Sequence, residues 1–190
     1  VKDNATYPSP AEVVERKAEA LSELYLKYCA QAAAKLADFR GVKRRLEPTA
    51  ERDAFLLVDD YAHHPSEVVA SLETLRRLHM DRELWVIFQP HTYSRLNEFF
   101  ADFAVAFNLA NRVIVMDTYG ARETPEAFPK SSKDLAEAVR EHVPAEHIAG
   151  EKEVVRRLAF ELGIREGTGQ VVVVTMGAGT VTDIGGALLD

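Results

Sequence analysis

A run of polar and ionisable residues follows a short apolar segment about one third of the way along the chain. The apolar segment is residues 54–58, and a helix-like pattern begins at Pro65. The side chains between them are two carboxylates, a phenol and two imidazoles: Asp59, Asp60, Tyr61, His63 and His64. In open parallel sheets, ligands bind at the carboxyl ends of strands, where turns project side chains into a crevice. This run is therefore a candidate site.

A second polar cluster occupies the same relative position behind the next apolar segment. Residues 84–88 are apolar, and His91, Tyr93 and Arg95 follow shortly after them. Alternate residues of an extended turn can point the same way, so these three side chains are candidates for one ligand. Two neighbouring parallel strands would direct this cluster and the first one to the same edge of a sheet.

The two clusters together predict one pocket between the two strand ends. We expect side chains of both clusters to converge there on a small ligand, with Asp60 and Tyr61 at the rim. An arginine can hold an α-carboxylate by two parallel hydrogen bonds, which lysine does not reproduce. A neutral histidine can orient a carboxylate or an amine. This chemistry suits a small ligand that carries a carboxylate or an amine.

Three side chains of the two clusters also have a structural interpretation. Asp60 would serve equally to cap the helix that begins at Pro65 or to accept turn amides. His64 would pack beneath the start of that helix, and Arg95 would be a solvated residue of a first helical turn. A metal site made by His63 and His64 is disfavoured, because adjacent histidines rarely converge on one ion and no third ligand is spaced for zinc.

Two further motifs flank this region. Residues 43–45 (Lys-Arg-Arg) form the one dense basic run, which is either a solvated face or a contact for an anion. Residues 177–179 (Gly-Ala-Gly) follow the apolar segment 171–175 and precede the last helix-like stretch. Small residues there allow a helix N-terminus to approach an anion or to pack closely on a sheet. The short pattern by itself favours close packing.

From residue 54 onward the chain alternates between two kinds of segment. Apolar runs typical of buried strands lie at 54–58, 84–88, 112–116 and 171–175. Stretches with helical character lie at 65–79, 94–109, 131–142, 151–162 and 180–189. This alternation predicts an α/β fold, a Rossmann-like, mostly parallel sheet flanked by helices. The strand runs are apolar throughout, as expected where helices cover both faces. Weaker strand signals lie at 45–47 and 148–149.

The N-terminal part has a different pattern. A polar lead-in precedes a helix predicted from about residue 10 to residue 38, with Ser9 and Glu12 as a capping box. Its apolar residues recur at steps of three and four: Val14, Ala18, Leu21, Leu24, Tyr25, Tyr28, Ala32 and Leu36. We expect two parts, a lead-in and helix at 1–38 and one domain at 39–190. The helix is either the last helix of a preceding domain or a separate packing and pairing element. Its apolar face must be covered by the sheet domain or by another copy, so self-association through this helix is a candidate interaction.

Composition restricts the class of protein. The chain has 190 residues, 47% of them hydrophobic, which is enough for one well-filled core. Its net charge of -7 argues against nucleic acid as a partner. The single cysteine, Cys29, excludes an internal disulfide, and no apolar run approaches the roughly 20 residues that span a membrane. The polar start shows no signal peptide, so we expect a cytoplasmic protein that binds no membrane.

Four motifs together resemble those of a known family. They are Arg-Gly-Val-Lys-Arg-Arg at 40–45, Val-Asp-Asp-Tyr-Ala-His-His-Pro-Ser-Glu at 58–67, Phe-Gln-Pro-His-Thr-Tyr-Ser-Arg at 88–95, and Gly-Ala-Gly at 177–179. In order and spacing they resemble the C-terminal domain of the UDP-N-acetylmuramate:L-alanine ligases, which are Mur ligases of peptidoglycan synthesis. The resemblance runs from about Phe39 to the end. Ligases that attach a recycled tripeptide to the same sugar nucleotide share much of the pattern.

The resemblance implies roles for individual residues. Arg45 would reach the ATP phosphates across a domain boundary, and Asp60 would face the nucleotide ribose, so both are candidates for catalysis and for nucleotide binding. His63 would lie beside the amino-acid substrate, and His91 and Arg95 would form its pocket. A guanidinium at the phosphates would neutralise charge that builds up as a phosphoryl group moves.

The same two motifs supply two more candidate substrate contacts, Tyr61 and Tyr93. One residue departs from the pattern, because many relatives carry Arg where this chain has Thr92, although Thr is also a common variant. Carboxylate binding would then rest more heavily on Arg95.

The sequence contains no P-loop, G-x-x-x-x-G-K-S/T, with which complete Mur ligases bind ATP. The resemblance implies that ATP and Mg2+ act in the complete enzyme and that UDP-N-acetylmuramate is bound by other domains. We therefore expect the chain to bind L-alanine or a similar amino acid, to hold no cofactor alone and to be inactive alone. The alternatives are the tripeptide-recycling ligase and a non-catalytic binding module. A nucleotide-dependent oxidoreductase is disfavoured, because no G-x-G-x-x-G turn follows the first strand.

Overall fold

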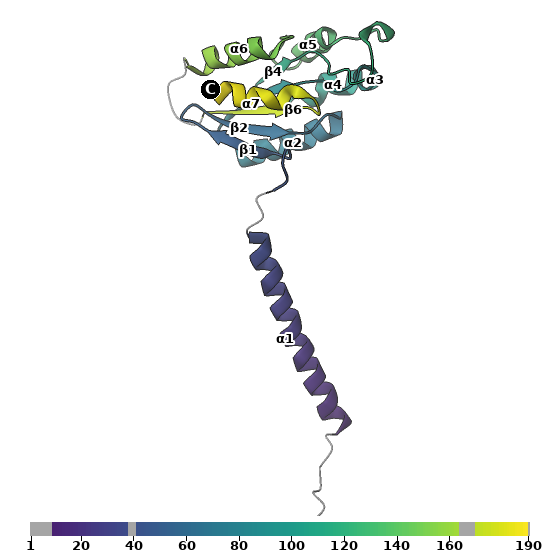
Figure 1. Cartoon of the computed structure of the whole chain (residues 1–190), viewed down its shortest axis with the longest axis vertical. Coiled ribbons are helices and arrows are strands. Elements are labelled where there is room, and N and C mark those ends of the chain that lie inside the picture. The colour runs from purple at the N-terminus through teal and green to yellow at the C-terminus, as the bar shows by residue number, and fades with distance from the viewer. Residues whose placement is uncertain (1–8, 38–40, 164–169, 190) are drawn as a thin grey trace, which may run out of the picture. The chain divides into compact units, whose positions relative to one another are not determined.

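The computed structural model describes residues 9–37, 41–163 and 170–189 (Figure 1). The chain divides into two compact units, Val1–Gly41 and Val42–Asp190. The domain boundary expected between residues 38 and 39 falls outside the described ranges. Among the described residues, the first unit contributes one long helix and the second contains the sheet.

Helix α1 (Pro10–Ala37) makes up the described part of the first unit. Its capping box is present, because the Glu12 amide donates to Ser9 Oγ at 3.3 Å and the Ser9 amide donates to Glu12 Oε2 at 2.7 Å. The hydrogen bonds from Ser9 lower the pKa of Glu12. The expected end at Asp38 is not among the described residues. Of the helices within the described ranges, none is both long and apolar enough to cross a bilayer.

A six-stranded sheet organises the described part of the second unit, with the strand order β1-β2-β6-β3-β4-β5. The strands are β1 (Glu47–Glu51), β2 (Phe55–Asp60), β3 (Glu83–Phe88), β4 (Arg112–Val115), β5 (Ala145–His147) and β6 (Val171–Met176). β1 pairs antiparallel with β2, and all the other pairs are parallel. The prediction of an α/β fold with a mostly parallel sheet is confirmed.

The two strands that precede the polar clusters are not neighbours, contrary to the expectation from their order in the sequence. β6 lies between β2 and β3 and pairs in parallel with both. The sequence could not show this, because β6 comes from the end of the chain. Since all three strands run in the same direction, their carboxyl ends still meet at one edge.

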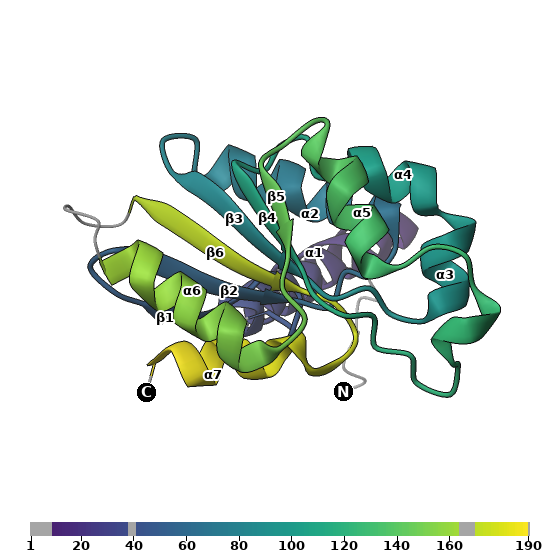
Figure 2. The ribbon, with the colours of Figure 1, turned by 90° about the horizontal axis from the view of Figure 1, so that it is seen from above.

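Helices cover both faces of the sheet, as Figure 2 shows. One face is packed by α2 (Pro65–Leu78), α3 (Tyr93–Glu98), α4 (Phe100–Ala106) and α5 (Ser132–Arg140). The opposite face is packed by α6 (Glu151–Gly163), the 3-10 turn η2 (Thr180–Thr182) and α7 (Asp183–Leu189). Residues along each strand alternate between the two cores, so that Val58 packs with the first set and Leu57 with the second. Burial on both faces explains the continuous apolar runs.

Several element boundaries differ from the sequence prediction. The helix expected at 94–109 is divided into α3 and α4 at Phe99, and another 3-10 turn, η1 (Pro125–Ala127), lies in the loop after β4. The strand expected at 45–47 starts at Glu47, because Leu46 has a φ of 48°, which no strand residue adopts. The strand expected at 148–149 is wrong, since β5 precedes it.

Candidate functional site

Strand β2 extends through both aspartates, and their side chains point to opposite sides of the sheet. Asp59 is 4% exposed and accepts hydrogen bonds from Thr175 Oγ1 at 2.7 Å, Thr182 Oγ1 at 2.8 Å and Arg44 Nε at 3.1 Å. Several donors to a buried carboxylate compensate for its lost hydration. Asp59 therefore joins three separate segments at the edge of the sheet.

Asp60 faces the α2 side and is 2% exposed. Its Oδ1 accepts the Ala62 amide at 2.9 Å, and its Oδ2 accepts the Ser71 hydroxyl at 2.8 Å. The first of these bonds is an Asx turn, which bends the chain out of β2. Asp60 thus fixes the turn that carries Tyr61 and His63, which is the structural role left open by the sequence.

His63 is held beside that turn by a hydrogen bond to the backbone. Its Nδ1 lies 2.8 Å from the carbonyl oxygen of Tyr61 and 3.4 Å from Glu67 Oε2. Both oxygens accept only, so Nδ1 carries the hydrogen, and in neutral His63 the Nε2 atom is the acceptor. The Tyr61 ring packs edge-on against His63 with centroids 5.2 Å apart.

His64 has a structural role at the start of helix α2 and not the ligand-binding role that its place in the first cluster suggested. It is the N-cap of α2: its Nδ1 accepts the Ser66 amide at 3.4 Å, and its ring packs against Phe99 with centroids 4.5 Å apart. Glu67 completes a capping box by accepting the amides of His63 and His64. His64 thus has the packing role that the sequence offered as the alternative.

The second cluster approaches His63 from the end of β3. The rings of His91 and His63 have centroids 5.7 Å apart, and Arg95 Nη1 lies 3.1 Å from His91 Nδ1 and 3.0 Å from the His91 carbonyl oxygen. Arginine only donates, so His91 Nδ1 accepts, and neutral His91 carries its hydrogen on Nε2. The remaining Arg95 donors, on Nε and Nη2, form the edge that suits a carboxylate.

Burial lowers the pKa of His91, and the positive charges of His63 and Arg95 lower it further, against an opposing effect of Glu123. The His91 imidazole is therefore protonated at a lower pH in the folded protein than in the unfolded chain. By linkage, the protein's stability falls as pH drops through the ordinary histidine value of about 6.5, and the loss ends below the folded pKa. A neutral His91 at physiological pH is a donor through Nε2.

We expect wild-type protein to lose more unfolding free energy than His91→Gln between about pH 7.5 and about pH 5.5, because glutamine has no proton to take up in this range. Urea denaturation at both pH values measures the difference. His142→Gln, at an exposed position after α5, is the control for removal of an imidazole. Equal pH dependence of wild type and His91→Gln would contradict this environment for His91.

Backbone strain accompanies the second cluster. Thr92 has a φ of 66°, which is unusual for a β-branched residue. This backbone conformation costs of order 1–3 kcal/mol. Thr92 is held there by its amide, which donates to the Tyr119 carbonyl oxygen at 2.9 Å, while its hydroxyl accepts the Arg95 amide at 3.4 Å as the N-cap of α3. Thr92 thus orients the turn that directs His91 and Arg95.

Tyr93 is directed toward the loop after β4. Its ring stacks on Phe128 with centroids 6.1 Å apart, and a Cβ on Gly120 would come within 2.8 Å of it. The next residue, Ser94, donates its hydroxyl to Glu123 Oε1 at 2.6 Å and its amide to Oε2 at 2.8 Å. These hydrogen bonds lower the pKa of Glu123. The start of α3 is therefore tied to this loop.

The basic run lies over the Tyr61 ring. The guanidinium carbons of Arg44 and Arg45 are 5.0 Å and 5.5 Å from the ring centroid. Arg44 is committed to the fold, since its Nη2 donates to the Gly177 carbonyl oxygen at 2.6 Å and its Nε pairs with Asp59. The Arg45 side chain is 54% exposed and lies 4.0 Å from Glu67. Arg45 is thus the more accessible of the two cations.

The glycine motif after β6 permits close packing. Gly177 has a φ of 149°, and a Cβ there would lie 2.7 Å from the carbonyl oxygen of Gln89. A Cβ on Gly179 would collide with Gln89 Oε1 and with the Tyr119 ring. The interpretation of this motif as a packing element agrees with these contacts.

Sequence reasoning missed two residues of this edge. Tyr119 stacks on His91 with centroids 5.6 Å apart, and Gln89, which is 6% exposed, accepts the Val181 amide at 3.1 Å. Tyr119 follows the apolar run at 112–116, so the rule that selected the other two clusters also applied to it. Gln89 also follows an apolar run directly, at 84–88, but its role was not predictable, because its partners Thr180 and Val181 come from the end of the chain.

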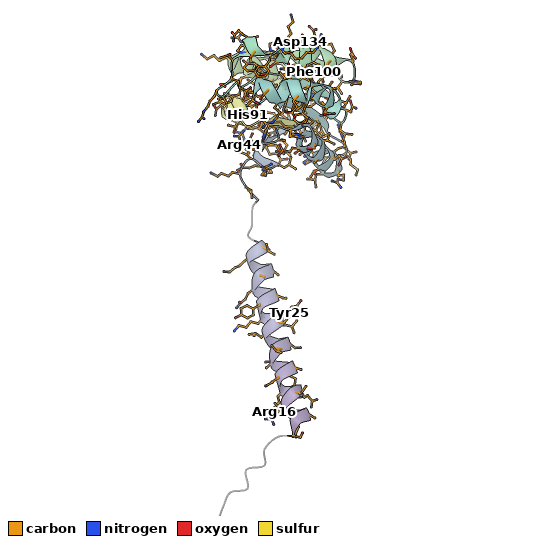
Figure 3. All side chains as sticks on the ribbon, turned by 90° about the vertical axis from the view of Figure 1, so that its right-hand side faces the viewer. Arg16, Tyr25, Arg44, His91, Phe100 and Asp134 are labelled. Atoms are coloured by element: carbon orange, nitrogen blue, oxygen red, sulfur yellow. The ribbon has the colours of Figure 1, made fainter. Side chains whose placement is uncertain are left out.

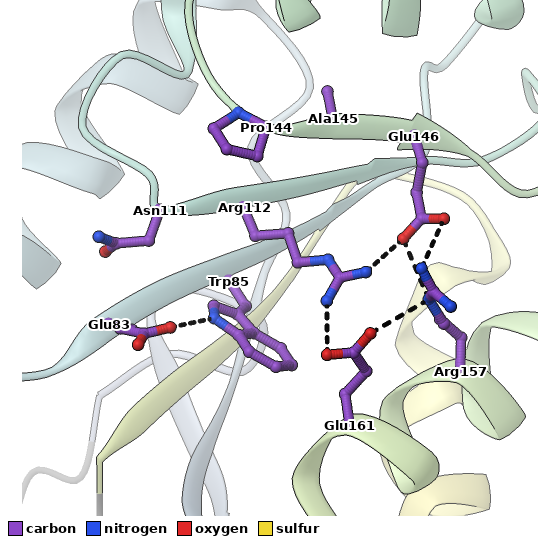
Figure 4. Close-up of a pocket in the computed structure, with 9 residues that line it drawn as sticks. All are labelled: Glu83, Trp85, Asn111, Arg112, Pro144, Ala145, Glu146, Arg157 and Glu161. Atoms are coloured by element: carbon purple, nitrogen blue, oxygen red, sulfur yellow. Dashed lines mark hydrogen bonds and ion pairs between the residues drawn. The ribbon is translucent and has the colours of Figure 1, made fainter. Parts of the chain in front are cut away.

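A separate cavity of about 390 Å³ opens at the opposite edge of the sheet (Figure 4). Arg112 lies there, 3.0 Å from Glu161 and 2.5 Å from Glu146, which also pairs with Arg157. Burial lowers the pKa of Arg112, but its bonds to the two carboxylates outweigh burial and raise it. The charges neutralise one another, so this network fastens α6 to the sheet.

A parallel sheet with histidine and arginine side chains at its carboxyl edge defines an α/β domain suited to a small polar ligand. The sequence profile of the family described as Mur ligase, glutamate ligase domain, matches residues 44–179. The chain belongs to this Mur ligase family, as the four motifs indicated.

Relatives within the family are longer than this chain. It is 40% identical over 151 residues to a UDP-N-acetylmuramate--L-alanine ligase of Alkaliphilus metalliredigens, covering 80% of this chain and 31% of that protein. It is 43% identical over 155 residues to the enzyme of the same name from Saccharopolyspora erythraea, covering 81% of this chain and 30% of that protein. The chain thus spans about a third of the length of these relatives.

Solved structures share the fold. A UDP-N-acetylmuramate-alanine ligase from Thermotoga maritima superposes with a TM-score of 0.61 at 23% identity, covering 80% of this chain and 30% of that one. A murein peptide ligase from Psychrobacter arcticus superposes with a TM-score of 0.58 at 22% identity, covering 83% and 32%. At these identities the similarity concerns the fold.

Proposed function

We propose that this chain provides the amino-acid-binding domain of an ATP-dependent UDP-N-acetylmuramate:L-alanine ligase of peptidoglycan synthesis. The observation that carries this proposal is the approach of His63, His91 and Arg95 at one sheet edge in a member of the Mur ligase family. In the complete enzyme, ATP with Mg2+ supplies the phosphoryl group that activates the sugar-nucleotide carboxylate for attack by the amine of L-alanine.

Three side chains have complementary roles toward the amino acid. Arg95 offers its Nε and Nη2 edge to the α-carboxylate, while its Nη1 holds His91 in place. His91 donates from Nε2 to the same carboxylate, and His63 accepts from the substrate amine through its own Nε2. The two tautomers follow from the hydrogen bonds at Nδ1. This arrangement fixes the amine toward the activated carboxylate.

The proposed nucleotide contacts are Arg45 and Asp60. Arg45 fits an anionic phosphate, because its guanidinium is accessible and its nearest carboxylate, on Glu67, is 4.0 Å away. Asp60 remains a proposed ribose contact, for which its carboxylate must exchange the Ser71 hydroxyl or the Ala62 amide for a ribose hydroxyl.

The two tyrosines, Tyr61 and Tyr93, are also proposed substrate contacts. Tyr61 offers its ring beside His63. Tyr93 lies on the loop side of α3, so it would reach a substrate that extends over that loop.

The described part of the chain offers no cluster that would hold a metal ion without further ligands. Residues 9–37, 41–163 and 170–189 contain no group of three or more His, Cys, Asp or Glu side chains that could hold a metal ion. We therefore assign Mg2+ no ligand here and propose that it binds with the ATP phosphates in the complete enzyme.

The isolated chain is expected to show no ATP-dependent formation of UDP-N-acetylmuramoyl-L-alanine, because it has no P-loop to hold the phosphates. Release of ADP and formation of product are measured for the chain alone and after addition of a separately produced P-loop domain and sugar-nucleotide domain. Turnover by residues 1–190 alone would overturn the proposed division of labour.

Calorimetric titration separates this proposal from its alternatives. Binding of L-alanine, weakened by Arg95→Ala, supports the ligase domain. Binding of the tripeptide without binding of L-alanine favours the tripeptide-recycling ligase, whose motifs are similar. Failure to bind either ligand, alone or with the added domains, identifies a non-catalytic module.

A further inference from the structure

Helix α1 carries an apolar stripe with a strict seven-residue repeat. Its members follow one another at steps of four, three, four, three and four: Val14, Ala18, Leu21, Tyr25, Tyr28 and Ala32. This average spacing of 3.5 residues is the period of a left-handed coiled coil, whereas a single straight helix has 3.6 residues per turn. The repeat therefore indicates packing against another helix along its length. In heptad notation, residues 18, 25 and 32 are a positions, and 14, 21 and 28 are d positions.

Within the first unit, no other described element covers the large side chains of this stripe. Val14, Leu21, Tyr25 and Tyr28 are 67%, 66%, 70% and 61% exposed. Tyr25 stands out from the helix in Figure 3, and Leu24, in the adjoining g position, widens the stripe. Contiguous exposed apolar surface of this kind marks an interaction site. Since α1 has 28 residues, the stripe lies on a helix about 42 Å long.

The charges of α1 are arranged asymmetrically along its axis. The first half carries four carboxylates: Glu12, Glu15, Glu19 and Glu23. These outnumber the two cations of that half, Arg16 and Lys17, whereas the second half carries only Lys27 and Lys35. A second copy in antiparallel orientation brings each acidic half against a basic half. A parallel copy brings like charges together.

Side-chain sizes favour the same orientation. In an antiparallel pair, a positions face d positions, so Val14 faces the partner's Ala32, Tyr28 faces the partner's Ala18, and Leu21 faces the partner's Tyr25. Two of these layers combine a large side chain with alanine, which lets the helices approach evenly. In a parallel pair, Tyr25 and Tyr28 would each face their own copy, and so would Lys35 at the next d position.

We propose that α1 is a dimerisation helix that pairs antiparallel with α1 of a second copy of this chain. The heptad repeat provides the residues along which the two helices pack. The asymmetric charge and the pairing of large with small residues favour a second copy in the antiparallel direction. The sheet domain contributes no residue to this argument, so the proposal is independent of the proposed function.

Sedimentation velocity of the full chain over a concentration series tests the association. Wild type is expected to sediment as a dimer, and Leu21→Glu as a monomer, because the glutamate would be buried in two central layers of the seam. Phe160→Glu is the matched control, since it replaces an exposed apolar residue of α6, 64% exposed, and should leave the dimer intact. A monomeric wild type, or a dimeric Leu21→Glu, would overturn the proposal.

Disulfide trapping tests the direction. In an antiparallel pair, the e position at Ser22 lies beside its own copy near the centre, so Ser22→Cys in a Cys29→Ser background should form a covalent dimer on mild oxidation. In the wild-type chain, Cys29 would lie about 18 Å from its copy along the helix axis, so it should form no covalent dimer. Ala18→Cys in the same background would trap a parallel pair. Trapping through residue 18 without trapping through residue 22 would refute the antiparallel orientation.

Discussion

In a chimera that carries residues 42–190 in place of the matching region of the Alkaliphilus metalliredigens ligase, Arg45→Ala is expected to lower kcat by about 10²-fold or more. The guanidinium is needed mainly where negative charge develops as the phosphoryl group moves. Its side chain is 54% exposed and its ion pair with Glu67 is long, at 4.0 Å, so it is available for a phosphate. The KM for L-alanine should change little, because the amino acid contacts other residues.

Lys43→Ala is the matched control for this substitution. Lys43 belongs to the same basic run and is exposed, so its removal reports the general loss of one positive charge. Steady-state rates with L-alanine varied at saturating ATP separate kcat from KM. Equal losses for the two variants would assign the basic run to general electrostatics, and an Arg45→Ala effect confined to the KM for L-alanine would contradict the phosphate role.

The fold was predictable from the sequence because hydrophobic pattern and local geometry agreed over most of the sheet domain. The parallel strands are apolar throughout, and the structure buries them on both faces. The errors occurred where long-range pairing decides the structure. β6 enters between β2 and β3 from the end of the chain, and β1 begins only after Arg44 and Leu46 have adopted positive φ values. The residue types did not predict this turn, because neither Arg44 nor Leu46 is glycine, the residue that usually adopts a positive φ.

The edge of the site was predictable to a smaller degree. A strand followed by polar residues indicates where side chains gather, and the structure brings His63, His91 and Arg95 together there. This sequence pattern does not indicate which hydrogen-bond or packing partner each side chain has. Asp60 is taken up by Ser71, eleven residues further along the chain, and Tyr93 turns toward Phe128. These partners depend on how helices and loops pack, which a local pattern does not encode.

Arg95→Ala in the same chimera is expected to raise the KM for L-alanine by about 10²-fold, with a smaller change in kcat. The α-carboxylate carries the same charge in the ground state and in the transition state, so a residue that holds it contributes uniform binding. Loss of the guanidinium also removes the two Nη1 hydrogen bonds that orient His91. Arg95→Ala should therefore also lower kcat slightly, because the amine of L-alanine would be less well positioned when His91 is no longer held in place.

Arg95→Lys separates charge from geometry. Lysine keeps the positive charge but lacks the planar pair of donors, so the KM should fall between wild type and Arg95→Ala, closer to the alanine variant. Arg77→Ala, at an exposed position of α2, controls for loss of a surface cation and should leave the KM unchanged. A lysine variant with wild-type KM would show that only charge matters, and an Arg95→Ala effect confined to kcat would place the carboxylate elsewhere.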